Sequence, residues 1–360
     1  MKVALVYDRV NKWGGAERVL LALHQLFPNA PLYTSVYNPK KAKWAKVFDV
    51  KTSFLQKFPN ASSSHEFYPT LMPLAFESFS FDEYDLVISV TSEAAKGIVT
   101  KPQTIHICYC LTPTRYLWSG YNFYFKNRFL RFFSKPAVAY LKKWENAALA
   151  RPDKFIAVSG EVKKRIKNYY KRESIVIYPS IDLPENLKNE EKQGKYFLVV
   201  SRLIPYKRID IAIKACNELK LPLKIIGTGK QRNKLKRISG KTIEFLGEVS
   251  DKKLWQYYGN CEALIFPGIE DFGLVMVEAQ TFGKPVIAFN GGGAKEIIKK
   301  GVTGEFFNKQ TPESLIDILK KFDHNRYNSL LCRENGKRFS FENFQTEFKN
   351  FLLKDLKIKI

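Results

Sequence analysis

The stretch Glu262-Ala-Leu-Ile-Phe-Pro-Gly-Ile-Glu-Asp-Phe-Gly-Leu-Val-Met-Val-Glu278 predicts a complete strand, turn and helix. The apolar run over 262–266 is typical of a buried strand, and the Pro-Gly pair after it marks a turn. We expect a helix from about Gly273, with Glu270 at its mouth and Glu278 lower on roughly the same side, because a helix has ~3.6 residues per turn. The amides at the start of this helix suit an anion or sugar hydroxyls.

Strands and helices alternate over the rest of the chain, which predicts an α/β protein with parallel sheets. Strands are expected at 3–7, 32–36, 85–90, 105–110, 155–158, 175–178, 196–200, 223–226, 243–246, 263–266 and 286–289, and helices at 16–27, 209–219, 232–238, 252–258, 294–299, 314–322, 327–338 and 341–353.

The length of the chain and one polar segment predict two domains. A chain of 360 residues exceeds one ordinary core, and the polar segment 183–194 contains Pro and Gly, as linkers do. We expect two Rossmann-like domains, 1–183 and 184–340, whose sheets face each other across a cleft. The last segment, 341–360, is expected to be a helix that packs back on the N-terminal domain.

The composition, 45% hydrophobic and 14% aromatic, is that of a globular protein. No window approaches the ~20 uncharged apolar residues of a membrane span, and the N-terminus resembles a strand more than a signal peptide, so we expect a cytoplasmic protein. The five cysteines are an odd number and lie mostly in apolar runs, which favours reduced core thiols. His106, Cys108 and Cys110 share one side of a predicted strand, but three such positions cannot surround a metal ion, so we interpret them as core residues.

Positive charge is concentrated in one part of the chain. The net charge is +24, and residues 101–172 contain 16 Lys and Arg against three acidic residues. Within this region, 121–145 mixes aromatic residues with cations. It is either a core helix whose lysines face water or a segment that lies on an anionic membrane surface, and we favour the membrane for residues 121–172. Nucleic acid is not the expected partner, because no recognition motif accompanies the charge.

Two sets of residues follow predicted strands at positions where α/β sheets bind ligands. Gly14 and Gly15 follow the first strand, and their pattern fits either a tight turn or a phosphate contact. Arg202 and Lys207 follow the strand at 196–200, and a guanidinium fork with a point charge suits a diphosphate. Arg208 is expected to face the helix surface or to pair with Asp210.

Two motifs together resemble the nucleotide-sugar domain of family 4 glycosyltransferases, which are retaining enzymes with the GT-B fold. They are Ser201-Arg-Leu-x3-Lys-Arg-x-Asp210 and Glu270-Asp-Phe-Gly-Leu-Val-Met-Val-Glu-Ala279. Gly14-Gly-Ala-Glu-Arg18, Ala157-Val-Ser159 and Ile177-Tyr-Pro-Ser-Ile-Asp182 are similar to further family segments, so the resemblance covers nearly the whole chain. The loop Tyr109-Cys-Leu-Thr-Pro-Thr-Arg-Tyr-Leu-Trp118 is similar to one in the branch of O-antigen mannosyltransferases, which implies GDP-mannose as the donor.

The resemblance also implies roles for individual residues. Arg202 and Lys207 would hold the donor diphosphate and stabilise its developing charge, and Glu270 would hold sugar hydroxyls, so these three are the predicted catalytic residues. The implied donor contacts are Gly14, Gly15, Ser201, Gly227, Phe272, Gly273, Leu274 and Glu278, the last on the ribose. Thr112, Arg115 and Tyr116 are the implied acceptor contacts.

Two features of the predicted site bear on its mechanism. No Asp-x-Asp motif lies at a strand end, so we expect no metal and no cofactor, with cationic side chains in place of a divalent ion. The two glutamates also resemble a glycosidase pair, but Arg202 and Lys207 would then have no task. Many relatives have a histidine near the reacting sugar where this chain has Leu111, which implies proton transfer through the donor phosphate or weakened activity.

The expected function is transfer of a hexose, with mannose from GDP-mannose favoured, to a lipid-linked or growing surface glycan. We expect the protein in the cytoplasm, peripheral at the inner face of the membrane. The alternatives are the same fold with a UDP-sugar such as UDP-glucose, and a non-catalytic relative that binds membrane or nucleic acid.

Overall fold

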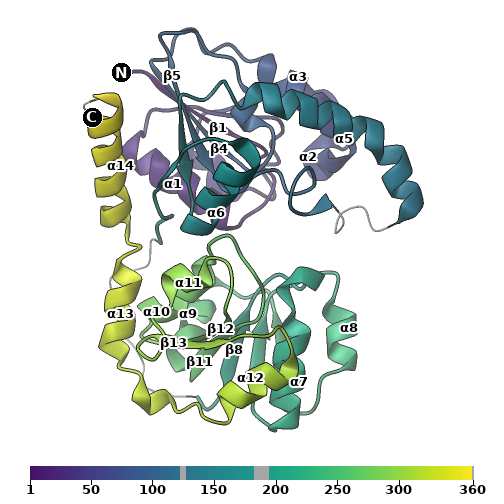
Figure 1. The fold of residues 1–360 in the computed structure, drawn as a ribbon, viewed down its shortest axis with the longest axis vertical. Helices are drawn as coiled ribbons and strands as arrows, with labels where there is room; N and C mark the ends of the chain where they lie inside the picture. The colour runs from purple at the N-terminus through teal and green to yellow at the C-terminus, as the bar shows by residue number, and fades with distance from the viewer. Residues whose placement is uncertain (122–126, 182–193, 359–360) are drawn as a thin grey trace. The chain divides into compact units, whose positions relative to one another are not determined.

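The computed structural model describes residues 1–121, 127–181 and 194–358. The chain forms two compact units, Met1–Ser180 with Phe344–Ile360, and Ile181–Asn343. The predicted α/β class with two Rossmann-like, parallel-sheet units is confirmed (Figure 1). The domain boundary predicted between 183 and 184, most of the linker at 183–194 and the part of the basic segment at 122–126 lie outside the described residues.

Unit 1 contains a seven-stranded parallel sheet in the order β3-β2-β1-β4-β5-β6-β7. Its strands are β1 Val3–Tyr7, β2 Leu32–Thr34, β3 Val50–Thr52, β4 Leu86–Thr91, β5 Ile105–Cys110, β6 Lys154–Ala157 and β7 Ile175–Val176. Its helices are α1 Gly15–Leu26, α2 Ala61–Ser64, α3 Met72–Glu77, α5 Arg128–Ala148, α6 Gly160–Arg165 and α14 Phe341–Leu356, with short 3-10 turns at η4 Pro69–Leu71 and η5 Ala95–Gly97. Every residue of β1 and β4 is buried, as expected of central strands covered on both faces.

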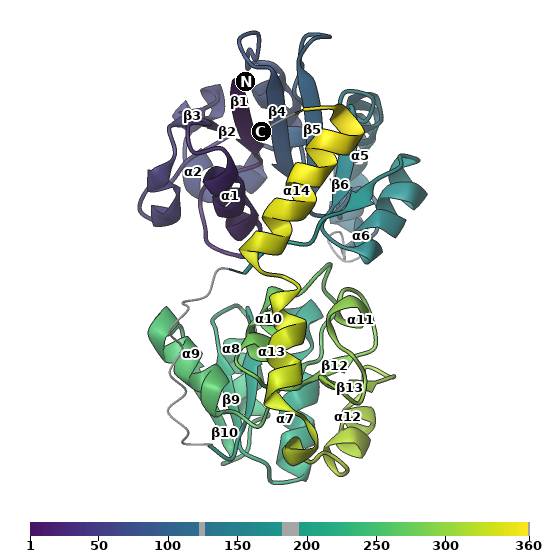
Figure 2. The ribbon, with the colours of Figure 1, turned by 90° about the vertical axis from the view of Figure 1, so that its left-hand side faces the viewer.

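The C-terminal helix α14 lies beside α1 in both views (Figures 1 and 2). The rings of Phe27, at the end of α1, and Phe348, on α14, meet edge to face at 6.3 Å. Phe344, Phe348 and Phe351 are all buried, so α14 contributes its apolar side to the core of unit 1.

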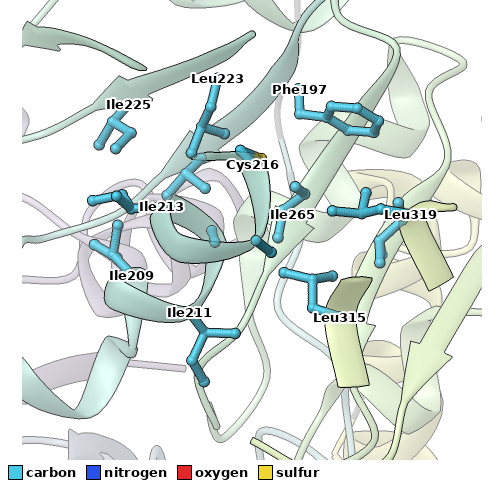
Figure 3. Close-up of a cluster of buried hydrophobic side chains, with 14 of the residues drawn as sticks. Phe197, Ile209, Ile211, Ile213, Cys216, Leu223, Ile225, Ile265, Leu315 and Leu319 are labelled. Atoms are coloured by element: carbon cyan, nitrogen blue, oxygen red, sulfur yellow. The ribbon is translucent and has the colours of Figure 1, made fainter. Parts of the chain in front are cut away.

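Unit 2 contains a six-stranded parallel sheet in the order β10-β9-β8-β11-β12-β13. Its strands are β8 Phe197–Val200, β9 Leu223–Ile226, β10 Ile243–Gly247, β11 Ala263–Phe266, β12 Val286–Phe289 and β13 Gly304–Phe307. Its helices are α7 Ile209–Glu218, α8 Arg232–Arg237, α9 Asp251–Asn260, α10 Leu274–Thr281, α11 Ala294–Ile297, α12 Pro312–Leu319 and α13 Ser329–Lys337, with the 3-10 turn η7 Pro205–Lys207. Figure 3 shows α7 and α12 packing isoleucine and leucine side chains against Phe197 and Ile265 of the sheet.

The strand order of each sheet creates one position where ligands bind in folds of this kind. In unit 2 the chain proceeds outward from β8 to β10 and then returns to β11 on the other side of β8. The loops after β8 and β11 therefore run in opposite directions and leave a crevice at the carboxyl ends of these strands. In unit 1 the same reversal falls between β1 and β4. No helix in the described part of the chain is long and apolar enough to cross a membrane.

Candidate active site

The loops after β8 and β11 bring two of the predicted catalytic residues together. The Lys207 ammonium, in η7 after β8, forms an ion pair with the Glu270 carboxylate, which follows β11. Their side chains are only 13% and 18% exposed, so the pair is largely removed from water. The Lys207 ammonium also lies 5.5 Å from the ring centroid of Tyr206 and 5.7 Å from that of Phe266, which favours a cation at this position.

The third predicted catalytic residue, Arg202, lies on the surface of the same loop. Its guanidinium donates to the Tyr206 hydroxyl at 3.0 Å and is otherwise exposed. This places an exposed guanidinium and a shielded ammonium on one loop. Arg208 does not join them, because it pairs with Asp210 at 3.2 Å, which is one of the two positions expected for it.

Ser201 and Gly227 bring the loops after β8 and β9 into contact. Gly227 has φ +125°, and a Cβ there would lie 2.0 Å from the Ser201 carbonyl oxygen. The Leu203 amide donates to the Thr228 carbonyl at 2.8 Å across the same contact. Glycine at 227 is therefore required by the backbone and by packing, independently of its predicted donor contact.

A second pair of loops packs just as closely around Glu270. The Gly293 amide, after β12, donates to the Glu270 carbonyl at 2.9 Å. A Cβ on Gly292 would lie 2.3 Å from that carbonyl oxygen, and one on Gly293 would lie 2.3 Å from the Phe272 carbonyl oxygen. The loop that contains Glu270 is thus fixed by backbone contacts before any ligand arrives.

Helix α10 begins close to where the sequence predicts. Gly273 is its N-cap with φ +103°, and Leu274 is its first residue. Phe272 is buried and meets Phe339 edge to face at 5.3 Å, which anchors the turn before the helix. The N-cap therefore lies three residues beyond Glu270, where the sequence predicts the start of the helix.

Glu278 is buried one turn into α10. The Tyr258 hydroxyl, from α9, donates to its Oε2 at 2.6 Å, and the Tyr258 ring stacks on Phe282 at 5.6 Å. A buried carboxylate needs such a donor, because desolvation without a hydrogen bond is costly. Tyr258 thereby fixes the orientation of the carboxylate for which the family resemblance implies a contact with the ribose.

At the corresponding edge of unit 1, Asp8 holds the loop after β4. Its carboxylate follows β1 and accepts bonds from the Thr91 hydroxyl at 2.8 Å and from the amides of Ser92, Glu93 and Ala95 at 2.7–3.1 Å. Arg9 pairs with Glu93 at 2.7 Å. Burial alone would lower the pKa of Arg9, but the carboxylates of Glu93 and Asp8 raise it, so Arg9 is a permanent cation.

The predicted acceptor contacts lie on the loop after β5. Thr112 is buried, and its hydroxyl has no hydrogen-bond partner within the described chain. Arg115 is half-buried. Burial, together with the carboxylates of Glu93 and Glu145, raises the pKa of Tyr116, so its phenol is a neutral hydrogen-bond donor at physiological pH.

The predicted Gly14 and Gly15 begin helix α1. Gly14 has an extended backbone with φ 178°, and Gly15 is the first helical residue and is exposed. Beneath them, Glu17 is buried and accepts a bond from the Tyr7 hydroxyl at 2.7 Å. The amides at the start of this twelve-residue helix are therefore placed at the carboxyl end of β1.

Two family models match the chain in succession. The model described as Glycosyltransferase Family 4 matches residues 13–185, and the model described as Glycosyl transferases group 1 matches residues 184–339. The chain belongs to glycosyltransferase family 4. An uncharacterized glycosyltransferase of Methanocaldococcus jannaschii is 33% identical over 198 residues, which are 54% of this chain and 56% of that protein.

Two further proteins resemble this chain. The O-antigen chain mannosyltransferase C of Escherichia coli is 24% identical over 160 residues, 42% of this chain and 43% of that protein. The matched region spans about half the length of the curated relatives. HepE of Anabaena, solved with UDP and glucose, superposes with a TM-score of 0.70 at 20% identity over 98% of this chain and 100% of HepE, so it has the same fold.

Other features of the structure lie apart from these residues. A pocket of about 320 Å³ between η7, α7 and α8 is lined by Arg208, Asp210 and Lys214 but by neither Lys207 nor Glu270. His106 is buried and bonded to Ser89 at 2.8 Å, within the core as predicted. Over the described ranges, no three His, Cys, Asp or Glu side chains are grouped to hold a metal ion.

Sequence reasoning missed several residues that support the site. Asp8 was identifiable as a carboxylate directly after a buried strand, which is a frequent ligand position. The run Gly291-Gly-Gly293 was predicted only as a turn, whereas two of its glycines pack on the Glu270 loop. Tyr258 gave no signal, because it occupies an ordinary apolar position of a helix.

Proposed function

We propose that this protein transfers a hexose from a nucleoside diphosphate sugar, and that the Lys207–Glu270 ion pair is the centre of the donor site. The observation that supports this is the position of the pair at the strand-order reversal of unit 2. Such a pair can exchange partners. The Lys207 ammonium would turn to the donor diphosphate, and the Glu270 carboxylate would then accept hydrogen bonds from sugar hydroxyls.

Lys207 and Arg202 would stabilise the leaving group. As the bond from the sugar to the diphosphate breaks, negative charge grows on the phosphate oxygens, and fixed cations lower the energy of that state. Lys207 supplies a shielded charge and Arg202 a bidentate donor on the exposed side. We propose that these cations replace a divalent metal ion, so chelation with EDTA should leave transfer unchanged, whereas an absolute requirement for Mn²⁺ or Mg²⁺ would refute the metal-free mechanism.

The remaining donor contacts follow from the same arrangement. Glu278, oriented by Tyr258, would accept bonds from the ribose hydroxyls. The amides at 272–274 would face the sugar and phosphate at the start of α10, with Ser201 and Gly227 behind the diphosphate. Gly14 and Gly15 would allow the start of α1 to approach the phosphates.

We propose GDP-mannose as the donor and a lipid-linked or growing surface glycan as the acceptor. The resemblance of the 109–118 loop and the similarity to a mannosyltransferase support mannose. The likeness to HepE, solved with UDP and glucose, supports the UDP-sugar alternative. Acceptor contacts through Thr112, Arg115 and Tyr116 and a cytoplasmic location at the inner face of the membrane belong to the same proposal.

Thermal-shift measurements with GDP, UDP and ADP test the donor site directly. A nucleotide at about 100 times its dissociation constant adds ~2.7 kcal/mol of stability. We expect the largest shift with GDP and its loss in Lys207→Ala, with Lys214→Ala, an exposed lysine on α7, as the matched control. A larger shift with UDP would favour the UDP-sugar donor, and no shift with any nucleotide would favour a non-catalytic relative.

A transfer assay tests catalysis. With GDP-mannose and membrane extract as acceptor, Lys207→Ala should lower the transfer rate about 10²–10³-fold, the usual cost of removing one group that stabilises developing charge. Lys214→Ala should retain the wild-type rate. An undiminished rate in Lys207→Ala would overturn the assignment of the ion pair.

A further inference from the structure

The outer side of helix α5 exposes a row of aromatic side chains. Phe129, Phe132 and Phe133 are 76%, 67% and 74% exposed, and Tyr140, further along the helix, is 45% exposed. Together with the exposed Pro136 they occupy positions i, i+3, i+4, i+7 and i+11, which share one side of a helix. We call these five residues the aromatic stripe.

The opposite side of α5 holds the helix in one orientation. Val138 and Leu141 are buried against Leu117, and Glu145 forms an ion pair with Lys96 at 2.6 Å. The helix also contacts the turns η4 and η5, and α2 and α3 lie near it in Figure 1. These contacts prevent α5 from rotating about its axis to bury the stripe, so the exposure of the phenylalanines is built into unit 1.

Positive charge surrounds the aromatic stripe. Arg128, Lys135 and Lys143 are exposed on α5. The only acidic residue between 128 and 148 is Glu145, which is buried and paired with Lys96. The outer surface of the helix therefore combines bulky apolar groups with cations and no carboxylate of its own.

This combination suits the headgroup region of an anionic bilayer. Aromatic side chains on one face of an amphipathic helix enter the boundary between headgroups and acyl chains, while flanking lysine and arginine contact lipid phosphates. A second copy of the chain is a less suitable partner, because pairing two such surfaces would bring positive charges close to each other. Nucleic acid would be drawn to the cations and could stack on the phenylalanine rings, but these rings supply no hydrogen bond to read a base, and the experiment below distinguishes the two partners.

We propose that α5 is a membrane-docking helix whose aromatic stripe enters a bilayer that contains anionic lipids. The proposal deepens the membrane location given under the proposed function by naming the surface that docks, and it does not depend on glycosyl transfer, because neither donor nor acceptor takes part in the docking. It gives a role to Arg128, Lys135 and Lys143, which contribute to the excess of positive charge at 101–172 and lie outside the donor site. The buried side of α5 contacts the loop after β5, which carries the proposed acceptor contacts. Docking would therefore hold that loop behind the helix, about one helix diameter (~10 Å) from the membrane surface.

Vesicle flotation without any sugar donor tests the proposal and separates it from the proposed catalysis. The full chain should float with vesicles of phosphatidylcholine and phosphatidylglycerol, and flotation should weaken at high salt and with phosphatidylcholine alone. The triple variant Phe129→Ser, Phe132→Ser, Phe133→Ser should lose flotation. Each of Arg128→Gln, Lys135→Gln and Lys143→Gln should weaken vesicle binding about fivefold.

Matched controls keep the result interpretable. Leu330→Ser removes a side chain that is also two-thirds exposed but lies in unit 2, and it should float as the wild type does. All replaced side chains point into water, so the thermal unfolding of each variant should match that of the wild type. The proposal fails if the triple variant still floats, if salt and lipid charge have no effect, or if the same phenylalanines are instead needed for binding single-stranded DNA or for dimer formation in sedimentation.

Discussion

Lys96 and Glu145 form an ion pair with an N–O distance of 2.6 Å, although each side chain is only 1% exposed. Glu145 also accepts bonds from the Trp118 indole at 2.5 Å, the Tyr170 hydroxyl at 2.9 Å and the Thr114 hydroxyl. Burial alone would lower the pKa of Lys96, but Glu145 raises it, so the ammonium stays charged inside the core. One carboxylate on α5 thus fixes the loop that carries the proposed acceptor contacts.

Glu145→Gln should destabilise unit 1 by about 3–5 kcal/mol, because it leaves the Lys96 ammonium buried without its counter-ion. Urea unfolding followed by tryptophan fluorescence measures this well, since four of the five tryptophans lie in unit 1 and Trp118 contacts Glu145. The double variant Lys96→Met, Glu145→Gln should recover much of the loss. Equal stability of Glu145→Gln and the wild type would show that the buried pair contributes nothing.

His106 should make unit 1 sensitive to acid. Burial first, and then the nearby Arg151, lower its pKa to about 3, and its Nε2 lies 2.8 Å from the Ser89 hydroxyl. The neutral ring is therefore kept in the folded state, while the unfolded chain takes up a proton below about pH 6.5. The contribution of the neutral His106 ring to the free energy of unfolding is therefore complete above about pH 6.5. It is lost as the pH falls from 6.5 towards 3, at about 1.4 kcal/mol per pH unit.

His106→Asn should reduce this slope. The comparison is best made between pH 6.5 and 5, before most carboxylates titrate, by measuring the free energy of unfolding of both proteins in urea. The difference between variant and wild type should shrink as the pH falls. A constant difference would mean that His106 has an ordinary pKa in the fold.

The elements that the sequence predicted best are those whose signal is local. The strands at 105–110, 223–226, 263–266 and 286–289 have the predicted bounds. The last two are unbroken apolar runs, and each of the first two is an apolar run with one polar residue, His106 or Lys224. Strands β3 and β13 were not predicted. β3 has three half-buried residues with a lysine at its centre, and β13 begins with a glycine, so neither shows an apolar run or clear alternation.

The residues of the candidate site likewise include some that the local sequence predicts and some that it does not. Lys207 and Glu270 were identifiable because each follows a strand at the carboxyl edge of the sheet in unit 2. The two strands, β8 and β11, are neighbours in that sheet, so the two side chains meet. The residues that form hydrogen bonds or ion pairs with the buried carboxylates were not identifiable from the sequence. Lys96 and Glu145 are 49 positions apart, and Tyr258 and Glu278 lie on different helices, so only packing in three dimensions reveals that they meet. The roles of the predicted site residues stay predictions.

Two glycines in unit 2 both have positive φ, but only one of them is tightly packed. Replacing each by alanine therefore distinguishes the loss of stability caused by a steric clash from the loss caused by backbone strain. The φ angle is +125° at Gly227 and +74° at Gly301. A Cβ at Gly227 would lie 2.0 Å from the Ser201 carbonyl oxygen, whereas one at Gly301 would meet nothing within 4 Å. Gly301→Ala should therefore cost about 1 kcal/mol, the usual strain of a non-glycine residue in the left-handed region.

Gly227→Ala should lower the free energy of unfolding several times as much as Gly301→Ala does. It should also weaken nucleotide binding, because the Ser201 loop must move. Unfolding free energies and the GDP thermal shift of the two variants provide the test. Similar values for both variants would show that the loop yields easily to an added methyl group.

Tyr258→Phe should weaken donor binding, because it removes the hydroxyl that orients Glu278, and should also lower the free energy of unfolding, because Glu278 is a buried carboxylate. A hydrogen bond to a charged group contributes about 1.5–3 kcal/mol, so we expect KM for the donor to rise about 10- to 100-fold while kcat changes little. Tyr196→Phe is the matched control, since its hydroxyl donates only to the Tyr257 carbonyl at 3.0 Å. A fall in kcat at constant KM would instead place Glu278 at the reacting centre, because interactions made only in the transition state change kcat and not KM.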